Sequence, residues 1–244
     1  MLEATFWGFV AAGSLLLGAA LALWRPWSTR TIGLVMAFGT GVLFSSVAFD
    51  LVEDALENGG GRPTTIGVAV GAVTYFVGDL IVSRRGAANR KRSDESARRE
   101  AGDPGAIVVG AVLDGIPESA AIGISLIGGG HVGGVFVAAV FMSNVPEALS
   151  ASAGLAKQGR SAGSIMRMWG VVVAASTLAA MAGYGLLDGA SVETIAFLSA
   201  FAAGAIFTML ASTMAPEAAQ EGGPVSGLVT TGGFLMAVLL DYMA

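Results

Sequence analysis

The sequence contains no cysteine and a single histidine in 244 residues. The lack of cysteine excludes a disulfide framework and a thiolate metal site. A single histidine likewise excludes a zinc site built from several imidazoles. That residue, His131, lies in the glycine-rich break GGGHVGG, and we interpret it as a loop residue rather than a ligand.

Charged residues are also scarce. They make up 13% of the chain, against about 25% in an average soluble domain, while 54% of residues are hydrophobic. The hydrophobic residues recur in runs of about 20, the length that a membrane span requires, and one large soluble core would not repeat in this way. We therefore predict an all-α integral membrane protein, with residues 1–244 forming a single polytopic membrane domain. The net charge of −5 and the absence of a basic domain give no indication of a nucleic-acid partner.

Short breaks rich in glycine, proline and charge separate eight predicted spans. These are Thr5–Trp24, Thr31–Val52, Thr65–Ser83, Ala106–Ile127, Val132–Ala156, Ser164–Leu187, Val192–Met214 and Val225–Met243. Residues 84–105 form the longest connection, which we predict to be a polar cytoplasmic loop because it is too polar to bury a core. The start of the chain lacks the basic region of a signal peptide, so the first run is expected to be an uncleaved helix.

The positions of lysine and arginine predict the orientation. With eight spans and both termini outside, twelve of the thirteen basic residues fall in inner loops or at inner helix ends, and Arg62 is the exception. Because short cytoplasmic loops carry an excess of lysine and arginine, this orientation is the expected one. We expect the cell (plasma) membrane as the location, with the lipid bilayer as a partner and a homodimer left open.

The second and seventh spans resemble each other. AFGTGVLFSSVAFDLVEDA, from Ala37, and AFAAGAIFTMLASTMAPEA, from Ala200, share six residues at an offset of 163. The two spans would run in opposite directions, which is typical of the inverted repeats of secondary transporters. We predict an inverted 3+2+3 organisation, while chance similarity between two helices rich in alanine, glycine and phenylalanine is the alternative.

A second pair of motifs lies in the fourth and fifth spans. Asp114-Gly115-Ile116-Pro117-Glu118 recurs 29 residues later as Ser143-Asn144-Val145-Pro146-Glu147. Residues four apart share one face of a helix, so Asp114 and Glu118 lie together, as do Ser143 and Glu147. An ionised carboxylate in hydrocarbon costs at least about 2.5 kcal/mol on insertion scales, so these groups are expected to face a cavity, a partner or an ion. If the two faces meet, three carboxylates and a hydroxyl converge, which predicts a site for a cation or a proton.

The two prolines strengthen this prediction. Pro117 cannot donate to the carbonyl of Leu113, and Pro146 cannot donate to that of Met142, so each helix frees one carbonyl beside its acidic turn. Carbonyl and amide oxygens, including that of Asn144, suit hard divalent cations. The alternative is a pair of kinked helices with protonated or capping acids.

Other acids in the spans carry weaker predictions. Asp50 in the second span, whose repeat partner is Thr213, and Asp79 in the third could line a pathway. They could equally lie near an interface and be hydrated.

With these motifs, the chain resembles the ZIP (Zrt/Irt-like) divalent-metal transporters over nearly its whole length. That family has eight spans, both ends outside and a variable cytoplasmic loop after the third span. Its fourth span carries H-N-x-P-E-G, where this chain has Asp114 to Ser119. Its fifth span has a histidine or glutamine four residues before a glutamate, where this chain has Ser143 and Glu147. Its seventh span often ends in D-E-x-x-P-E-A, where this chain has Ser212 to Ala218.

The departures from the family pattern alter the expected site. The family's fourth-span histidine is Asp114 here, its asparagine is Gly115, and its seventh-span acid is Thr213. Family members often hold two adjacent metals. The resemblance leaves Asp114, Glu118, Ser143 and Glu147 for a first site. Only Asn144 remains for a second, with the two glutamates able to bridge, so we predict one metal site.

The resemblance implies a transporter of zinc, manganese, iron or cadmium, with the divalent ion as cargo rather than as a resident cofactor. An oxygen ligand set favours manganese or iron over zinc, although carboxylates also bind zinc. By analogy with the family, the two helix triplets would move about the site and carry the metal inward. The alternative is a proton-coupled transporter of another solute that uses Glu118 and Glu147 as proton carriers. An enzyme is not expected, because no water-activating motif such as HExxH occurs.

Overall fold

The structure is a computed structural model that describes residues 1–82, 104–127 and 134–243. Helices are the only regular secondary structure within these ranges, as predicted. His131 and residues 84–103 of the predicted loop lie outside them. The last two residues of that loop, 104 and 105, belong to a helix, so the fourth span begins earlier than expected.

Eight helical spans are long and apolar enough to cross a membrane, which confirms the predicted fold class. The elements are α1 (Leu2–Trp24), α2 (Thr29–Ser46), η1 (Val47–Glu53), α3 (Asp54–Gly59), α4 (Gly61–Val82), α5 (Pro104–Ser125), α6 (Gly134–Lys157), α7 (Ala162–Gly185), α8 (Val192–Met209), η4 (Leu210–Met214), α9 (Ala215–Gly222) and α10 (Ser226–Met243).

Two of the spans are longer than predicted. α2, η1 and α3 form one helical run of 31 residues, and α8, η4 and α9 form another of the same length. We expected the runs to end at Val52 and Met214, where the apolar pattern stops. The polar extensions stay helical because they are rich in alanine, leucine and glutamate, which favour helix. Each run ends at a glycine with positive φ, Gly60 or Gly223, a common stop signal for a helix.

Each long run contains a π-helical segment, η1 or η4. The segments begin at Val47 and Leu210, so their starting positions differ by 210 − 47 = 163 residues. This is the offset that relates the second and seventh spans in the sequence.

Serine residues define where several helices begin. The side chains of Ser28, Ser161 and Ser191 accept hydrogen bonds from backbone N–H groups in the first turns of α2, α7 and α8. Such caps satisfy donors that have no partner within the helix. They explain why these three starts lie within about two residues of the predicted ones.

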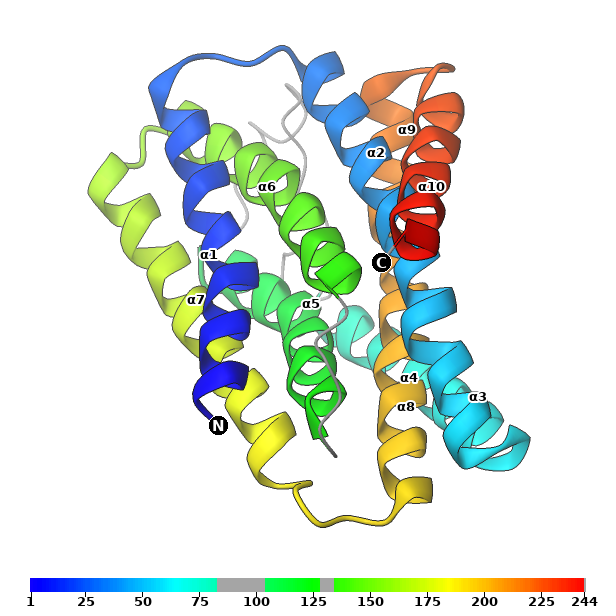
Figure 1. Ribbon diagram of the computed structural model, residues 1–244. Helices are drawn as coiled ribbons and strands as arrows, with labels where there is room; N and C mark the ends of the chain where they lie inside the picture. Colours follow the sequence, from blue (N-terminus) through cyan, green and yellow to red (C-terminus); the bar gives the residue numbers. More distant parts are fainter. Residues whose placement is uncertain (83–103, 128–133, 244) are drawn as a thin grey trace.

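The helices pack in two groups, which are visible in Figure 1. We call α1, α5, α6 and α7 the α1 group, because α1 packs mainly on α6 and α7 while α5 packs mainly on α7. The remaining helices form the α2 group, in which α10 packs on α2 and α4 packs on α8. The groups meet where α6 lies against α2 and where α5 lies against α8 and α4.

Glycines bring the helices of the α2 group into close contact. A Cβ atom at Gly41 of α2 would overlap the Thr230 carbonyl of α10, and one at Gly233 of α10 would overlap the Phe38 carbonyl. Small residues allow this approach between membrane helices. The contact of α8 with α4 is similar, since a Cβ at Gly204 would overlap the Val68 carbonyl.

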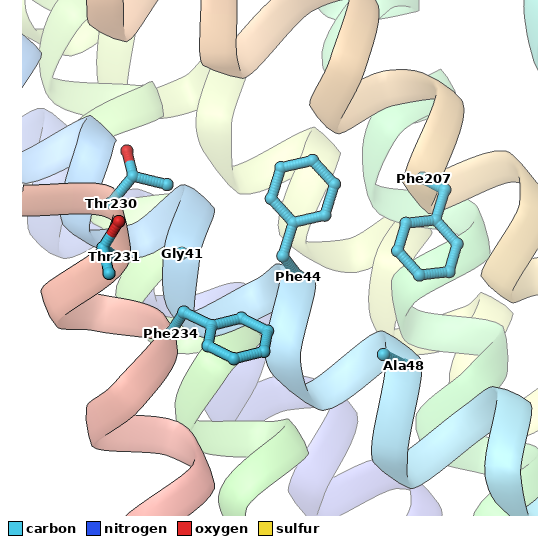
Figure 2. A pocket seen from close by; sticks show the side chains of 7 residues that line it. All are labelled: Gly41, Phe44, Ala48, Phe207, Thr230, Thr231 and Phe234. Carbon is cyan, nitrogen blue, oxygen red and sulfur yellow. The ribbon is translucent and has the colours of Figure 1, made fainter. Parts of the chain in front are cut away.

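An apolar pocket of about 350 Å³ lies within the α2 group, between α2, α8 and α10 (Figure 2). Its lining residues are Gly41, Phe44, Ala48, Phe207, Thr230, Thr231 and Phe234. The rings of Phe44 and Phe207 meet there with centroids 5.9 Å apart. None of the predicted metal ligands lines this pocket.

Candidate functional site

The two Pro-Glu motifs lie in the middle of α5 and α6, and both helices continue through their prolines. The five predicted ligands are buried, each at most 5% exposed: Asp114, Glu118, Ser143, Asn144 and Glu147. Buried polar groups on this scale require compensation by hydrogen bonds or a bound ion. This stretch of the two helices is therefore the main candidate for a functional site.

The first residue of each motif faces the α2 group. Asp114 accepts a hydrogen bond at its Oδ1 from the hydroxyl of Tyr75 on α4, with an O–O distance of 2.5 Å. The start of the α6 motif lies against α2, because a Cβ atom at Gly39 of α2 would lie 3.1 Å from the Cα of Ser143. Both motifs therefore begin where the two helix groups meet.

The second residue of each motif faces the α1 group. Asn144 donates from Nδ2 to the carbonyl oxygen of Ala11 on α1, at 3.2 Å. The hydroxyl of Ser14 donates to the same carbonyl. In the other motif, a Cβ atom at Gly115 would lie 2.8 Å from the Oγ of Ser176 on α7. The amide of Asn144 thus ties α6 to α1, whereas Gly115 offers α7 no side chain.

The hydroxyl of Ser143 donates to the carbonyl of Val140, one turn earlier in its own helix, at 3.0 Å. In this state the hydroxyl proton is directed along α6. The oxygen lone pairs remain the part of Ser143 that could bind a cation.

One of the two carbonyls freed by proline has a clear neighbour. A Cβ atom at Gly39 would lie 3.1 Å from the Met142 carbonyl oxygen, so this oxygen faces the backbone of α2. A glycine at this position leaves the carbonyl uncovered by any side chain from residue 39.

Over the described ranges, no three histidine, aspartate or glutamate side chains form a group that could hold a metal ion. The convergence of Asp114, Glu118 and Glu147 stays a prediction. The five residues remain predicted ligands, buried on two helices that lie in the same group.

Asp50 lies in η1, in the α2 group. Its carboxylate is repelled by that of Asp241 on α10. Its Oδ2 is buried without a hydrogen-bond partner among the described residues. Asp50 thus lies on a different helix group from the α5 and α6 motifs. Its role in a pathway stays a prediction.

Sequence reasoning missed three polar neighbours of the motifs, Tyr75, Ser14 and Ser176. All three are buried on helices that precede or follow the motifs by many residues. Ser176 is notable because its Oγ has no hydrogen-bond partner within the described part of the chain. The only signal in the sequence was a polar residue in an apolar run, which many buried serines share.

The eight spans and the buried polar motifs define a polytopic membrane protein with a polar centre. No family model matches the chain. A comparison with curated proteins finds a relative in Arabidopsis thaliana named "Putative zinc transporter At3g08650", 26% identical over 215 residues. The match covers 85% of this chain but 33% of the relative, so the chain spans about a third of that protein's length. The relative is named as a transporter rather than an enzyme, which agrees with the expectation for this chain.

Proposed function

We propose that the protein is a membrane transporter of divalent transition metal cations and that the cation binds between α5 and α6. The observation that carries this proposal is the burial of Glu118 and Glu147, each in a Pro-Glu turn, within an apolar bundle. Ionised carboxylates are costly in such surroundings unless hydrogen bonds, a proton or a cation compensate them. The name of the plant relative supports a metal as cargo.

In this proposal Asp114, Glu118 and Glu147 supply the negative charge, while Ser143 and Asn144 supply neutral oxygen ligands. The carboxylates do not form a metal-holding group in the described state. A cation bound by both turns would remove the repulsion between their carboxylates. The replacement of the family's asparagine by Gly115 favours one bound ion over two.

The cargo belongs to the class of zinc, manganese, iron or cadmium. Carboxylate, hydroxyl and amide ligands favour manganese or iron. Zinc stays within this class because carboxylates also bind it, and the plant relative is named for zinc.

We also propose that the first three and last three spans form an inverted repeat. Contacts within the α2 group support it. Gly41 meets Thr230, and Gly204, which is 163 residues after Gly41, meets Val68 in the same way. Phe44 and Phe207, which are also 163 residues apart, touch each other, as expected for residues beside a two-fold axis.

Repeats of this kind usually surround a transport site near the midplane. The α1 group would move against the α2 group to open the site to each side in turn. The orientation with both termini outside, the cell membrane location and inward movement of the metal remain part of this proposal.

The test is uptake by purified protein in liposomes. Initial rates would be measured for Mn²⁺, Fe²⁺, Zn²⁺, Cd²⁺, Co²⁺ and Mg²⁺, with and without a pH gradient. A Glu118→Ala/Glu147→Ala variant would be compared with a Glu3→Ala/Glu193→Ala variant, which removes two exposed glutamates. Circular dichroism and size-exclusion chromatography would establish that each variant is folded.

Saturable uptake of one or more metals that is lost only in the Glu118/Glu147 variant is the expected result. Unchanged uptake in that variant would remove the site from the proposal. Proton flux that depends on Glu118 and Glu147 without uptake of any metal would replace it with the proton-coupled transporter.

A further inference from the structure

Tyr75 on α4 is a buried tyrosine, 2% exposed, whose hydroxyl donates to Asp114. It is one of three tyrosines in the chain, and the other two, Tyr184 and Tyr242, are partly or fully exposed. The donor and the acceptor belong to different helix groups. This hydrogen bond therefore crosses the junction of the groups at the first predicted ligand of α5.

The position of Tyr75 is fixed by the packing of α4. One turn earlier, a Cβ atom at Gly71 would overlap the Phe201 carbonyl of α8, so α4 lies directly against α8. On the side of α5, a Cβ atom at Gly78 would lie 3.1 Å from a methyl carbon of Leu113. Helix α4 is thus packed between α8 and the helix that carries Asp114.

The position on α10 that corresponds to Tyr75 on α4 is not a tyrosine. Gly233 of α10 packs on the Phe38 carbonyl as Gly71 packs on that of Phe201, and these carbonyls are 163 residues apart. Four residues beyond Gly233 is Ala237, which is also buried. Alanine has no polar side chain, so among the described residues this place has no counterpart of the Tyr75 hydroxyl.

The hydrogen bond limits how Asp114 can bind a cation. A carboxylate binds a metal through one oxygen or through both, and Ca²⁺, which takes 6–8 oxygen ligands in all, often uses both. The Tyr75 hydroxyl occupies one of the two lone pairs of Oδ1, so two-oxygen binding by Asp114 would compete with this hydrogen bond for the same oxygen. Binding through a single oxygen leaves the bond in place and suits smaller ions with fewer ligands.

We propose that Tyr75 is a positioning residue that holds Asp114 to single-oxygen binding and thereby selects small divalent cations over Ca²⁺. The inference rests on the proposed function, since it assigns a selectivity to the same site. Hydrogen-bonded partners of metal ligands commonly change metal affinity or activity by about 10–100-fold when removed.

The test uses Tyr75→Phe, which keeps the ring and removes the hydroxyl. Tyr184→Phe and Tyr242→Phe are matched controls, because each removes the same atom elsewhere. Mn²⁺ uptake by proteoliposomes would be measured against Mn²⁺ concentration and with Ca²⁺ as competitor. Calorimetric titration of the purified protein with Mn²⁺ and Ca²⁺ would give the affinities independently of transport.

For Tyr75→Phe we expect the KM for Mn²⁺ to rise about tenfold, with the maximal rate within about twofold of the parent protein. Ca²⁺ should compete at a concentration about tenfold lower. The control variants should leave both quantities unchanged. In an Asp114→Ala background, Tyr75→Phe should no longer alter either affinity, because its acceptor is gone.

An unchanged KM and unchanged Ca²⁺ competition in Tyr75→Phe would overturn the inference. A loss of affinity that persists in the Asp114→Ala background would also overturn it, because the tyrosine would then act through packing. The proposed function fails by a different result, which is metal uptake that survives loss of Glu118 and Glu147. The two failures are therefore distinguishable in one set of measurements.

Discussion

The α5 and α6 motifs share a Pro-Glu turn but differ in their polar contacts. On α5, Asp114 takes a hydrogen bond from the opposite helix group, while Gly115 offers no side chain to α7. On α6, Ser143 bonds to its own helix, while Asn144 is tied to α1. The glycine contacts of the α2 group, in contrast, match on both sides. The α2–α10 and α8–α4 pairs thus pack in the same way, whereas the α5 and α6 motifs differ in their hydrogen bonds.

The largest effect on metal uptake is expected at the glutamates that both motifs share. Glu118→Gln and Glu147→Gln should each lower the rate of metal uptake by about 100-fold, at or beyond the upper end of the effects known for outer-shell partners of metals. Each removes a charge while keeping the shape of the side chain. Initial rates in proteoliposomes would measure the loss, with Glu193→Gln as a control at an exposed position. If the uptake rates of the two variants differ by more than about tenfold, the two turns do not contribute equally to the site.

The contacts at Gly41 and Gly204 should contribute nearly equal free energies to the stability of the protein. Gly41→Ala and Gly204→Ala each place a methyl group on a carbonyl of the neighbouring helix, and overpacking of this kind costs about 1–3 kcal/mol. Unfolding in detergent with increasing SDS would measure the loss of stability. Gly232→Ala on α10, with no described neighbour within 4 Å, is the control and should leave stability unchanged or raise it by up to about 1 kcal/mol. Destabilisation by only one of the first two variants would count against the repeat.

A smaller effect on stability is expected at Asn144. Asn144→Ala removes the hydrogen bond to Ala11 and should cost about 1 kcal/mol, the range measured for polar contacts between membrane helices. The Ser14 hydroxyl still donates to the same carbonyl, so the acceptor does not become unsatisfied. The same SDS unfolding measurement applies. No change would mean that the amide is not a structural tie and is free to serve the site.

The smallest effect is expected at Ser176. Its buried hydroxyl has no partner within the described ranges, so Ser176→Ala should leave stability unchanged or raise it by up to about 1 kcal/mol. Ser152→Ala is the matched comparison, because Ser152 is also buried but accepts a hydrogen bond from Trp169 Nε1 at 2.7 Å. That variant should be destabilised by about 1–3 kcal/mol, since it leaves a buried indole N–H without an acceptor. A clear loss of stability in Ser176→Ala would contradict this expectation.

The sequence predicts the spans well because each apolar run is long and bounded by turn residues. It fails at the ends of the two long runs, where polar residues remain helical after the apolar pattern stops. The prolines and acids of the two motifs are visible by their spacing, since residues four apart share a helix face. The Tyr75–Asp114 and Asn144–Ala11 contacts join residues 39 and 133 positions apart. Such contacts depend on how the helices pack, which no local pattern encodes.

The π-helical segments η1 and η4 have a consequence for reading and mutating the two long helices. A π turn accommodates one extra residue, and one residue corresponds to about 100° of rotation in an α-helix. Side chains after Val47 and Leu210 are therefore out of phase with those before, and a helical wheel drawn from Thr29 to Gly59 places the later residues on the wrong face. Deleting one residue within η1 would convert it to regular helix and turn Asp54 and Glu57 to a new side. Single-residue deletions across η1 would test this change of phase. They should change which acidic side chains are accessible from the end of the helix.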